Sequence, residues 1–212
     1  MRLLYVFDAL CGWCYGFSSV MDQLHDEFSS SLPFEVISGG MVIGSKVGPI
    51  KEVAGYIADS YKTVEERTGV KFGRDFLDGT LKSGQVIFDS FPPAKALRIF
   101  KEFKPEETIQ FASEIQRATY YDGMDPGDFD LYSRMVEKYG VSKQDFKILW
   151  NSVDYDVRTR EEFILASQLN VSGYPTVFFE AESKYHKIAS GYTSFSVLRD
   201  RLEHIMRLAE YK

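Results

Sequence analysis

The sequence has very few cysteines for its length. Only two of the 212 residues are cysteine, Cys11 and Cys14, and they lie within four positions of each other. A chain of this length buries about 70% of the surface that its unfolded form exposes, so it needs no framework of disulfides. A bond between Cys11 and Cys14 would close too short a loop to restrict the unfolded chain strongly. The cysteine count therefore excludes a disulfide-rich scaffold.

Positive charge and long apolar runs are also scarce. There are 25 Lys and Arg against 31 Asp and Glu, a net charge of −6, and no basic run. We therefore expect no nucleic-acid partner. Apolar stretches such as 3–7 are far shorter than the ~20 residues that cross a membrane, so we expect no membrane partner. Without a secretory signal ahead of Cys11, we expect a cytoplasmic protein, in which paired cysteines are more often catalytic or metal-binding than structural.

The two ends of the chain have the pattern of an α/β fold. Apolar runs at 2–7 and 34–37 predict buried strands, and apolar residues at three- and four-residue steps predict a helix between them. Near the other end, the capping-box sequence Thr159 to Glu162 predicts the start of a helix that runs to about Leu169. Two strands and a last helix capped by Ser194 follow, and the strands are predicted at 176–179 and 185–188, joined by a turn at 180–183.

The middle of the chain has helix signals and almost no strand signal. Pro49 suits a first helical turn, and further helices are predicted at 93–103, 105–121, 128–139 and 142–150. The simplest arrangement is an α/β domain, residues 1–45 and 159–212, that is interrupted by an all-helical insertion, residues 46–158.

The sequence Cys11-Gly12-Trp13-Cys14 lies where the first predicted strand gives way to the first helix. Unpaired helix amides and the helix dipole favour an anion there, so we expect a lowered pKa for the Cys11 thiol. Cys14 falls on the inward face of the helix and should be shielded. We therefore predict that Cys11 is the nucleophile and that Cys14 resolves the mixed disulfide. A cytosolic CxxC in a βαβ context is typical of thioredoxin-like redox proteins.

Two other interpretations of the cysteines remain. A structural zinc site needs four ligands. Because the chain has only two cysteines and few histidines, such a site would form between two chains. The protein would then be a non-catalytic binding module. The cysteines could also be small buried apolar residues. We predict no metal and no bound cofactor, with glutathione or another thiol as the redox partner that the chemistry allows. The three histidines are His25, His186 and His204.

A second candidate feature is Tyr174-Pro175, at the start of the C-terminal pair of strands. In this context we expect a cis peptide bond that presents the backbone of Tyr174 as a hydrogen-bonding edge for an extended peptide. Trp13, Tyr15 and Tyr174 would flank Cys11, and we expect them to form an apolar rim that binds the substrate.

Two polar residues near predicted helix starts are Asp8 and Ser90. Because short polar side chains favour such positions, we expect both to cap helices. For Asp8 the alternative is an orienting or proton-handling role.

These motifs resemble those of a known family. Cys11-Gly12-Trp13-Cys14-Tyr15-Gly16-Phe17, with Gly173-Tyr174-Pro175-Thr176 far downstream, is similar to the DsbA-type thioredoxin-fold oxidoreductases, over nearly the whole chain. The most similar group is the cytoplasmic branch of proposed protein disulfide isomerases related to FrnE. The resemblance implies a thioredoxin-like fold (βαβ and ββα) with a helical insertion. It also implies Cys11 as the attacking cysteine, Cys14 as the resolving cysteine and Pro175 as the cis-proline.

The chain departs from the family pattern between its cysteines. Periplasmic members carry Pro-His there, whereas this chain has Gly12 and Trp13. An indole cannot bring a positive charge to the thiolate, so we expect a smaller lowering of the pKa and a less oxidising couple. We therefore predict a disulfide reductase or isomerase that acts on a disulfide-containing protein or peptide, or on glutathione.

A second function is compatible with the same fold. The chain is similar to the glutathione-dependent 2-hydroxychromene-2-carboxylate isomerases and kappa-class glutathione transferases, which use a single Ser or Cys. Such enzymes place ligand contacts near the segment that contains Ser90, which is the alternative to its role as a cap. The presence of Cys14 argues against this function.

Overall fold

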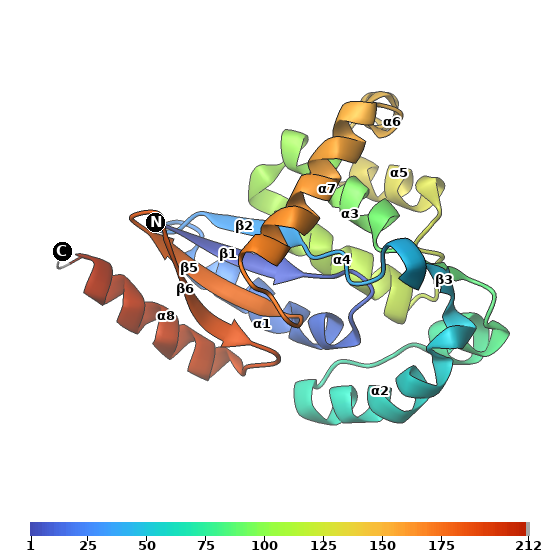
Figure 1. Ribbon diagram of the computed structural model, residues 1–212, viewed down its shortest axis with the longest axis horizontal. Helices are drawn as coiled ribbons and strands as arrows, with labels where there is room; N and C mark the ends of the chain where they lie inside the picture. The colour runs from blue at the N-terminus through green and yellow to red at the C-terminus, as the bar shows by residue number, and fades with distance from the viewer. Residues whose placement is uncertain (211–212) are drawn as a thin grey trace.

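The computed structural model describes residues 1–210, and its centre is a four-stranded sheet (Figure 1). The strand order is β2-β1-β5-β6. Strand β1 is parallel to β2 and antiparallel to β5, and β5 is antiparallel to β6. The two ends of the chain therefore share one sheet, which confirms the predicted thioredoxin-like α/β fold. The strands are β1 (Arg2–Phe7), β2 (Phe34–Ser38), β5 (Thr176–Ala181) and β6 (Lys184–Ser190).

Helices cover both faces of this sheet. Helix α1 (Gly12–Phe28) and helix α8 (Phe195–Glu210) pack against one face. Helix α7 (Val153–Gln168) packs against the other face, and in Figure 1 it crosses in front of the sheet. Ser194 precedes α8, as predicted, and its carbonyl accepts the N–H of Leu198.

Strand β1 is buried on both faces, which explains its continuous apolar run. Leu3, Tyr5 and Phe7 point to the side of α1 and α8. Leu4 and Val6 point to the side of α7. No residue from Leu3 to Phe7 is more than 2% exposed, so the end of β1 is a fixed platform for the residues that follow.

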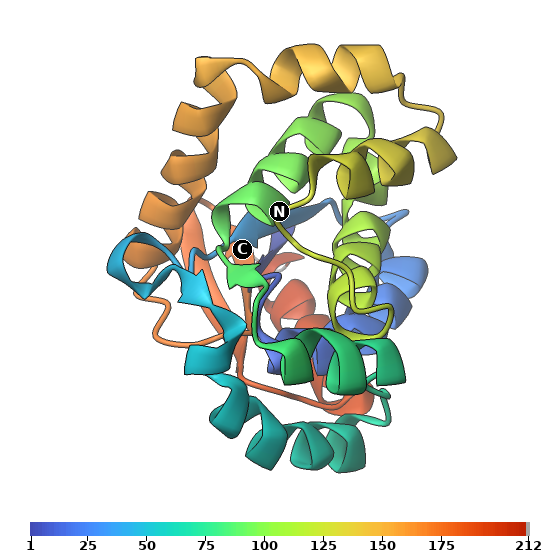
Figure 2. The same cartoon turned by 90° about the vertical axis from the view of Figure 1, so that its right-hand side faces the viewer.

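The middle of the chain is mainly helical, and Figure 2 shows its helices arranged around the sheet end at which β1 stops. The helices predicted at 93–103, 105–121, 128–139 and 142–150 are confirmed within a few residues. A π-helical segment, Asp75–Leu81, was not predicted. The α-helices are α2 (Ala54–Thr68), α3 (Phe91–Phe103), α4 (Thr108–Tyr120), α5 (Phe129–Lys138) and α6 (Lys143–Trp150).

One prediction about this region is wrong in detail. Pro49 does not begin a helix: it lies in the short strand β3 (Gly48–Pro49), which pairs with β4 (Ile87–Phe88). A 3₁₀ turn follows, and α2 begins only at Ala54. A pair of two-residue strands has too few residues to produce an alternating apolar pattern, so the sequence carried no strand signal here.

The capping box predicted at Thr159 to Glu162 is also wrong. Helix α7 begins at Val153 and passes through these residues without a break. The Thr159 hydroxyl donates to the Tyr155 carbonyl inside the helix, at 2.6 Å. The predicted division of the chain at residues 45/46 and 158/159 stays a prediction, and α7 runs continuously across the second position.

Glu162 instead joins three elements in the interior. Its carboxylate accepts the backbone N–H of Ser38 at the end of β2, at 2.9 Å, and pairs with Lys101 of α3, at 2.6 Å. The Lys101 ammonium also donates to the Val36 carbonyl. The two charged side chains are only 12% and 10% exposed. This buried pair therefore attaches α7 and α3 to the edge of the sheet.

In the part of the chain that the structure covers, no helix is both long enough and apolar enough to span a membrane.

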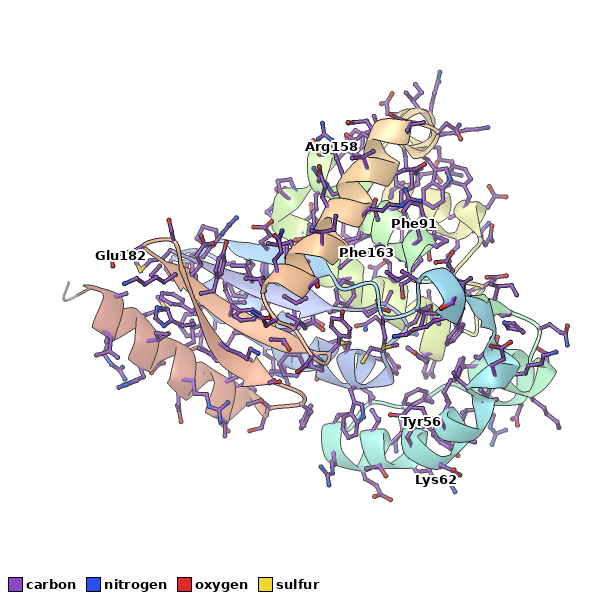
Figure 3. The ribbon with its side chains drawn as sticks, in the orientation of Figure 1. Tyr56, Lys62, Phe91, Arg158, Phe163 and Glu182 are labelled. Atoms are coloured by element: carbon purple, nitrogen blue, oxygen red, sulfur yellow. The ribbon has the colours of Figure 1, made fainter. Side chains whose placement is uncertain are left out.

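We expect Glu162→Ala to lower the free energy of unfolding by about 3 kcal/mol, because Lys101 is left as a buried charge without its partner. Urea denaturation measures the change. The control is Arg158→Ala on the outer face of α7, where Arg158 pairs with Asp154 and Glu102 at the surface (Figure 3). Loss of an exposed ion pair should change stability little. Equal effects of the two substitutions would contradict a structural role for Glu162.

Candidate active site

The CxxC segment occupies the junction between β1 and α1, as predicted. Cys11 is the N-cap of α1 and has an extended backbone, with φ of −95° and ψ of 111°. Its carbonyl accepts the N–H groups of Cys14, at 3.0 Å, and Tyr15, at 3.1 Å. Both cysteines are free thiols. The Cys11 side chain thus lies at the end of the helix where backbone N–H groups are unpaired.

The two thiols lie in unequal environments. Cys11 is 7% exposed, and Cys14 is completely buried. A hydrogen bond from the Cys14 thiol and the backbone N–H groups of Cys14 and Trp13 lower the pKa of Cys11, although burial opposes them. Burial and the neighbouring Cys11 raise the pKa of Cys14 well above its usual value. Cys11 is therefore the more acidic thiol, which agrees with the prediction from its place at the helix start.

Tyr174 and Pro175 lie opposite Cys11, and the peptide bond between them is cis, as predicted. The Cys11 thiol donates to the Tyr174 carbonyl, with 3.6 Å between sulfur and oxygen. The Tyr174 hydroxyl donates to the Gly39 carbonyl at 2.7 Å. A Cβ atom at position 39 would lie 2.1 Å from the Tyr174 ring, so only glycine fits there. Tyr174 therefore presents its backbone to the sulfur, while its ring packs against the loop after β2.

That loop is held by Asp8, which is buried directly after β1. The Asp8 carboxylate accepts the N–H of Leu10 at 2.9 Å, the N–H of Met41 at 2.6 Å and the Ser90 hydroxyl at 2.9 Å. Burial raises the pKa of Asp8, although these hydrogen bonds oppose the shift. The Ser90 hydroxyl in turn accepts the N–H of Val42 at 2.9 Å.

The expected capping roles of Asp8 and Ser90 are therefore wrong. Neither α1 nor α3 has a side-chain cap, although Cys11 and Ser90 occupy their N-cap positions. The two side chains instead connect the end of β1, the loop after β2 and the start of α3. The turn in that loop needs glycine at position 40, where φ is +68° and the Phe163 ring of α7 (Figure 3) would meet a Cβ atom at 2.7 Å.

Next to Cys11 is a pocket of about 490 Å³. Its walls are the CxxC segment, the loop after β2, β3 and one side of α2. Figure 3 shows Tyr56 on the side of α2 that faces the body of the protein and Lys62 on the opposite side. The lining is largely apolar, and it includes Trp13, Met41, Ile57, Phe72, Phe88 and Tyr120. The pocket can accept an apolar group beside the Cys11 sulfur.

Only one of the three predicted rim residues lines this pocket. Trp13 does, whereas the Tyr174 ring packs against Gly39. Tyr15 lies below the pocket: its hydroxyl donates to the Lys71 carbonyl at 2.8 Å, and its ring stacks on Tyr120 at 5.5 Å. Tyr15 thus supports the wall, and the prediction that its side chain contacts substrate has no support.

Several contacts of the site carry no sequence signal. The Tyr120 hydroxyl donates to the Leu10 carbonyl at 2.5 Å, and Ser90 reaches Asp8 from 82 positions away. The apolar stripe at Ile57 and Val64 does predict a helix, but it gives no indication that these residues line a pocket beside Cys11. Residues 1–210 contain no group of three or more His, Cys, Asp or Glu side chains that could hold a metal ion.

We expect alkylation by iodoacetamide to separate the two thiols. Because the pKa of Cys11 is lowered, its rate should reach half-maximum below the pH of about 8.5 that a free thiol requires. Cys14 should react at least about 100-fold more slowly, since its thiol is buried and its pKa is raised. Mass spectrometry of the two labelled peptides measures both rates over a pH series. Faster labelling of Cys14 than of Cys11 would refute the assignment of the acidic thiol.

Comparison with known proteins places this site in a family. No curated protein sequence matches the chain. Among solved structures, a proposed protein disulfide isomerase from Nitrosomonas europaea matches with a TM-score of 0.86 and 24% identity, over 98% of each chain. The cytosolic disulfide reductase DsbM from Pseudomonas aeruginosa matches with a TM-score of 0.82 and 24% identity, over 99% of this chain and 100% of DsbM. Its structure with GSH has a TM-score of 0.78 and 23% identity, over 98% and 100%.

A 2-hydroxychromene-2-carboxylate isomerase has a TM-score of 0.66 and 16% identity, over 98% of this chain and 96% of that one. At these identities the likeness shows a shared fold. The family evidence comes from the sequence itself, because the DSBA-like thioredoxin domain matches residues 2–203. With a free CxxC at the start of α1 and a cis-proline opposite it, the chain belongs to the family of DSBA-like thioredoxin domains.

Proposed function

We propose that this DsbA-like thiol–disulfide oxidoreductase reduces or isomerises disulfides in proteins or peptides, with Cys11 as the nucleophile and Cys14 as the resolving thiol. The observation that carries the proposal is the contrast between the two sulfurs. The acidic Cys11 faces the Tyr174 backbone at the edge of the pocket, and Cys14 is buried directly behind it. A dithiol with one accessible and one shielded sulfur suits a two-step exchange.

The reaction proceeds in two exchanges. The Cys11 thiolate attacks one sulfur of the substrate disulfide, a mixed disulfide forms, and the other substrate sulfur leaves and takes a proton. Cys14 then loses its proton and attacks Cys11, which releases the second substrate thiol and leaves a Cys11–Cys14 disulfide. Two molecules of a small thiol such as glutathione supply the two electrons that restore the dithiol, and they leave as their disulfide. In isomerisation, another substrate thiol resolves the mixed disulfide.

The charge around Cys11 favours reduction or isomerisation over oxidation. The groups that most lower its pKa are hydrogen-bond donors of the CxxC segment, and none carries a positive charge. The Cys11 thiolate is therefore stabilised only moderately. A Cys11–Cys14 disulfide should then be a weaker oxidant than a disulfide whose attacking cysteine lies beside a positively charged group. The structural neighbour DsbM is described as a cytosolic disulfide reductase and has a structure with GSH. By analogy, we propose a cytoplasmic setting and glutathione as an electron donor.

The pocket supports a peptide or protein as the substrate. Its apolar wall begins at Trp13 and continues along α2, so an apolar side chain next to the substrate cystine would be removed from water there. The Tyr174 backbone, whose carbonyl faces the Cys11 thiol, supplies the edge along which an extended chain would lie. Pro175 fixes that edge in position opposite Cys11.

A glutathione-dependent isomerase is the second candidate, because the 2-hydroxychromene-2-carboxylate isomerase shares the fold and the pocket beside Cys11 is apolar. Such chemistry would need only the first thiol. Glutathione-dependent turnover that survives in Cys14→Ser would favour this function over disulfide exchange.

For the main proposal, we expect the protein to reduce insulin disulfides with dithiothreitol or glutathione as the electron donor. Cys11→Ser should lose the activity, because the attacking sulfur is gone. Cys14→Ser should accumulate mixed disulfides through Cys11, detectable by non-reducing electrophoresis. The reduction potential of the unmodified protein, measured against a glutathione series, should lie nearer to that of thioredoxin, about −270 mV, than to that of DsbA, about −120 mV. Full activity of Cys11→Ser would refute the proposal.

We expect Ile57→Ala to lower kcat/KM at least tenfold for a peptide disulfide flanked by aromatic residues, because the substitution removes three carbon atoms from the pocket wall and each one that the substrate buries contributes about 0.8 kcal/mol. Turnover of the small polar substrate 2-hydroxyethyl disulfide should be unchanged. The control is Lys62→Ala, on the opposite side of the same helix (Figure 3). If Ile57→Ala slows both substrates equally, the pocket does not select the flanking residue.

A further inference from the structure

The hydroxyl of Tyr5 is buried without a hydrogen-bond partner. Tyr5 lies in the middle of β1, is 2% exposed and points toward α1. Two other buried tyrosines do have partners: Tyr120 donates to the Leu10 carbonyl and Tyr132 to the Pro126 carbonyl. A buried donor without a partner destabilises the fold, so its presence calls for an explanation.

The surroundings of this hydroxyl contain the two reacting sulfurs. The Tyr5 ring packs against Phe7, at 5.4 Å between centroids, and against Phe17 of α1, at 5.9 Å. Cys14 lies three residues before Phe17 on the same buried face of α1, so the Tyr5 ring that packs on Phe17 lies beside Cys14. After burial, the charges that most raise the pKa of Tyr5 are those of Cys14 and Cys11. The backbone N–H of Asp8 lowers the pKa of Cys14, against the larger effect of burial.

The resolving step needs a negative charge at this place. Cys14 has no exposed surface, so water cannot stabilise its thiolate. In the thiol form, Cys14 gives the Tyr5 hydroxyl only a weak acceptor. A thiolate is a much stronger acceptor, because hydrogen bonds to ionised groups are shorter and stronger than those between neutral groups.

We propose that the Tyr5 hydroxyl is the hydrogen-bond donor that stabilises the Cys14 thiolate in the resolving step, together with the backbone N–H of Asp8. The inference rests on the proposed function, because it assigns a role within the same dithiol exchange. It gives Tyr5 a positioning role for the second sulfur and leaves the first attack by Cys11 unaffected.

In this step Tyr5 donates a hydrogen bond and keeps its proton. Cys14 loses its proton, the Cys14 thiolate attacks the Cys11 sulfur, and a Cys11–Cys14 bond forms. The bond between Cys11 and the substrate breaks, and the substrate sulfur leaves as a thiolate and takes up one proton. Two electrons pass from the enzyme dithiol to the substrate disulfide, so atoms and charge balance.

Other titratable groups near Cys14 are already committed. The Asp8 carboxylate accepts three donors, and its negative charge disfavours a thiolate at Cys14. The Tyr120 hydroxyl is bound to Leu10 and the Tyr174 hydroxyl to Gly39. On α1, the carboxylate of Asp22 is paired with the Ser113 hydroxyl. Among these side chains, Tyr5 alone has a donor available for the sulfur.

Tyr5→Phe tests the inference, because it removes only the hydroxyl. Reduced protein is mixed with oxidised glutathione, quenched with acid at intervals and analysed by mass spectrometry, which separates the mixed disulfide from the Cys11–Cys14 disulfide. We expect the resolving step to slow about tenfold at pH 7 and its pH midpoint to move upward, because the thiolate loses a donor. The rate of Cys11 alkylation should stay within twofold of the unmodified protein. Thermal stability of the dithiol form should not fall, since the hydroxyl has no partner there.

The matched control is Tyr132→Phe, which removes a partnered hydroxyl in the helical region. It should lower thermal stability and leave the resolving rate and its pH midpoint unchanged. An unchanged rate and midpoint in Tyr5→Phe would overturn the role of Tyr5 while the proposed function stands. Reduced stability of its dithiol form would also overturn it, because the hydroxyl would then have a partner before the reaction. If the unmodified protein forms no mixed disulfide at Cys11, both proposals fail.

Discussion

The position of Cys11 at the first turn of α1 is the constraint on which the rest of the site depends. The residue must be extended to end β1 and must also begin a helix, so its sulfur faces the unpaired amides of that helix. This geometry holds only because β1 is fixed on both faces, by α1 and α8 on one side and α7 on the other. A fully buried strand thus serves to place one sulfur at the surface of the pocket.

A buried carboxylate secures the other side of the same junction. Asp8 follows β1 directly and collects donors from the loop after β2 and from the start of α3. A charge in the interior is tolerated only when hydrogen bonds compensate it. The network therefore fixes Met41 and Val42 as a wall of the pocket, although neither belongs to a helix or strand. Gly39 and Gly40 leave the space for Tyr174 and Phe163 that this loop position requires.

Local patterns in the sequence predict most of this arrangement. The strands at the two ends of the chain and the first helix follow from short apolar periods, and the CxxC at a strand-to-helix junction predicts which thiol is acidic. The failures at polar residues share one physical cause. Thr159 and Glu162 have the spacing of a helix cap, yet the partner of Glu162 is an amide 124 positions away. Asp8 and Ser90 are misassigned for the same reason, because a polar side chain's partner depends on tertiary packing.

The sulfurs and the outer wall of the pocket are held by different parts of the fold, and this has a chemical consequence. The sulfurs, Tyr5 and the Tyr174 backbone all rest on the central sheet, whereas the outer wall of the pocket comes from α2 and the segment around β3. Substitutions in the outer wall can change which substrate approaches Cys11 without altering the acidity of either thiol. Substitutions of residues that pack around the sulfurs, such as Tyr5, should change the acidity of the thiols and leave the choice of substrate unchanged. In the proposed mechanism, separate structural elements therefore control substrate choice and sulfur chemistry.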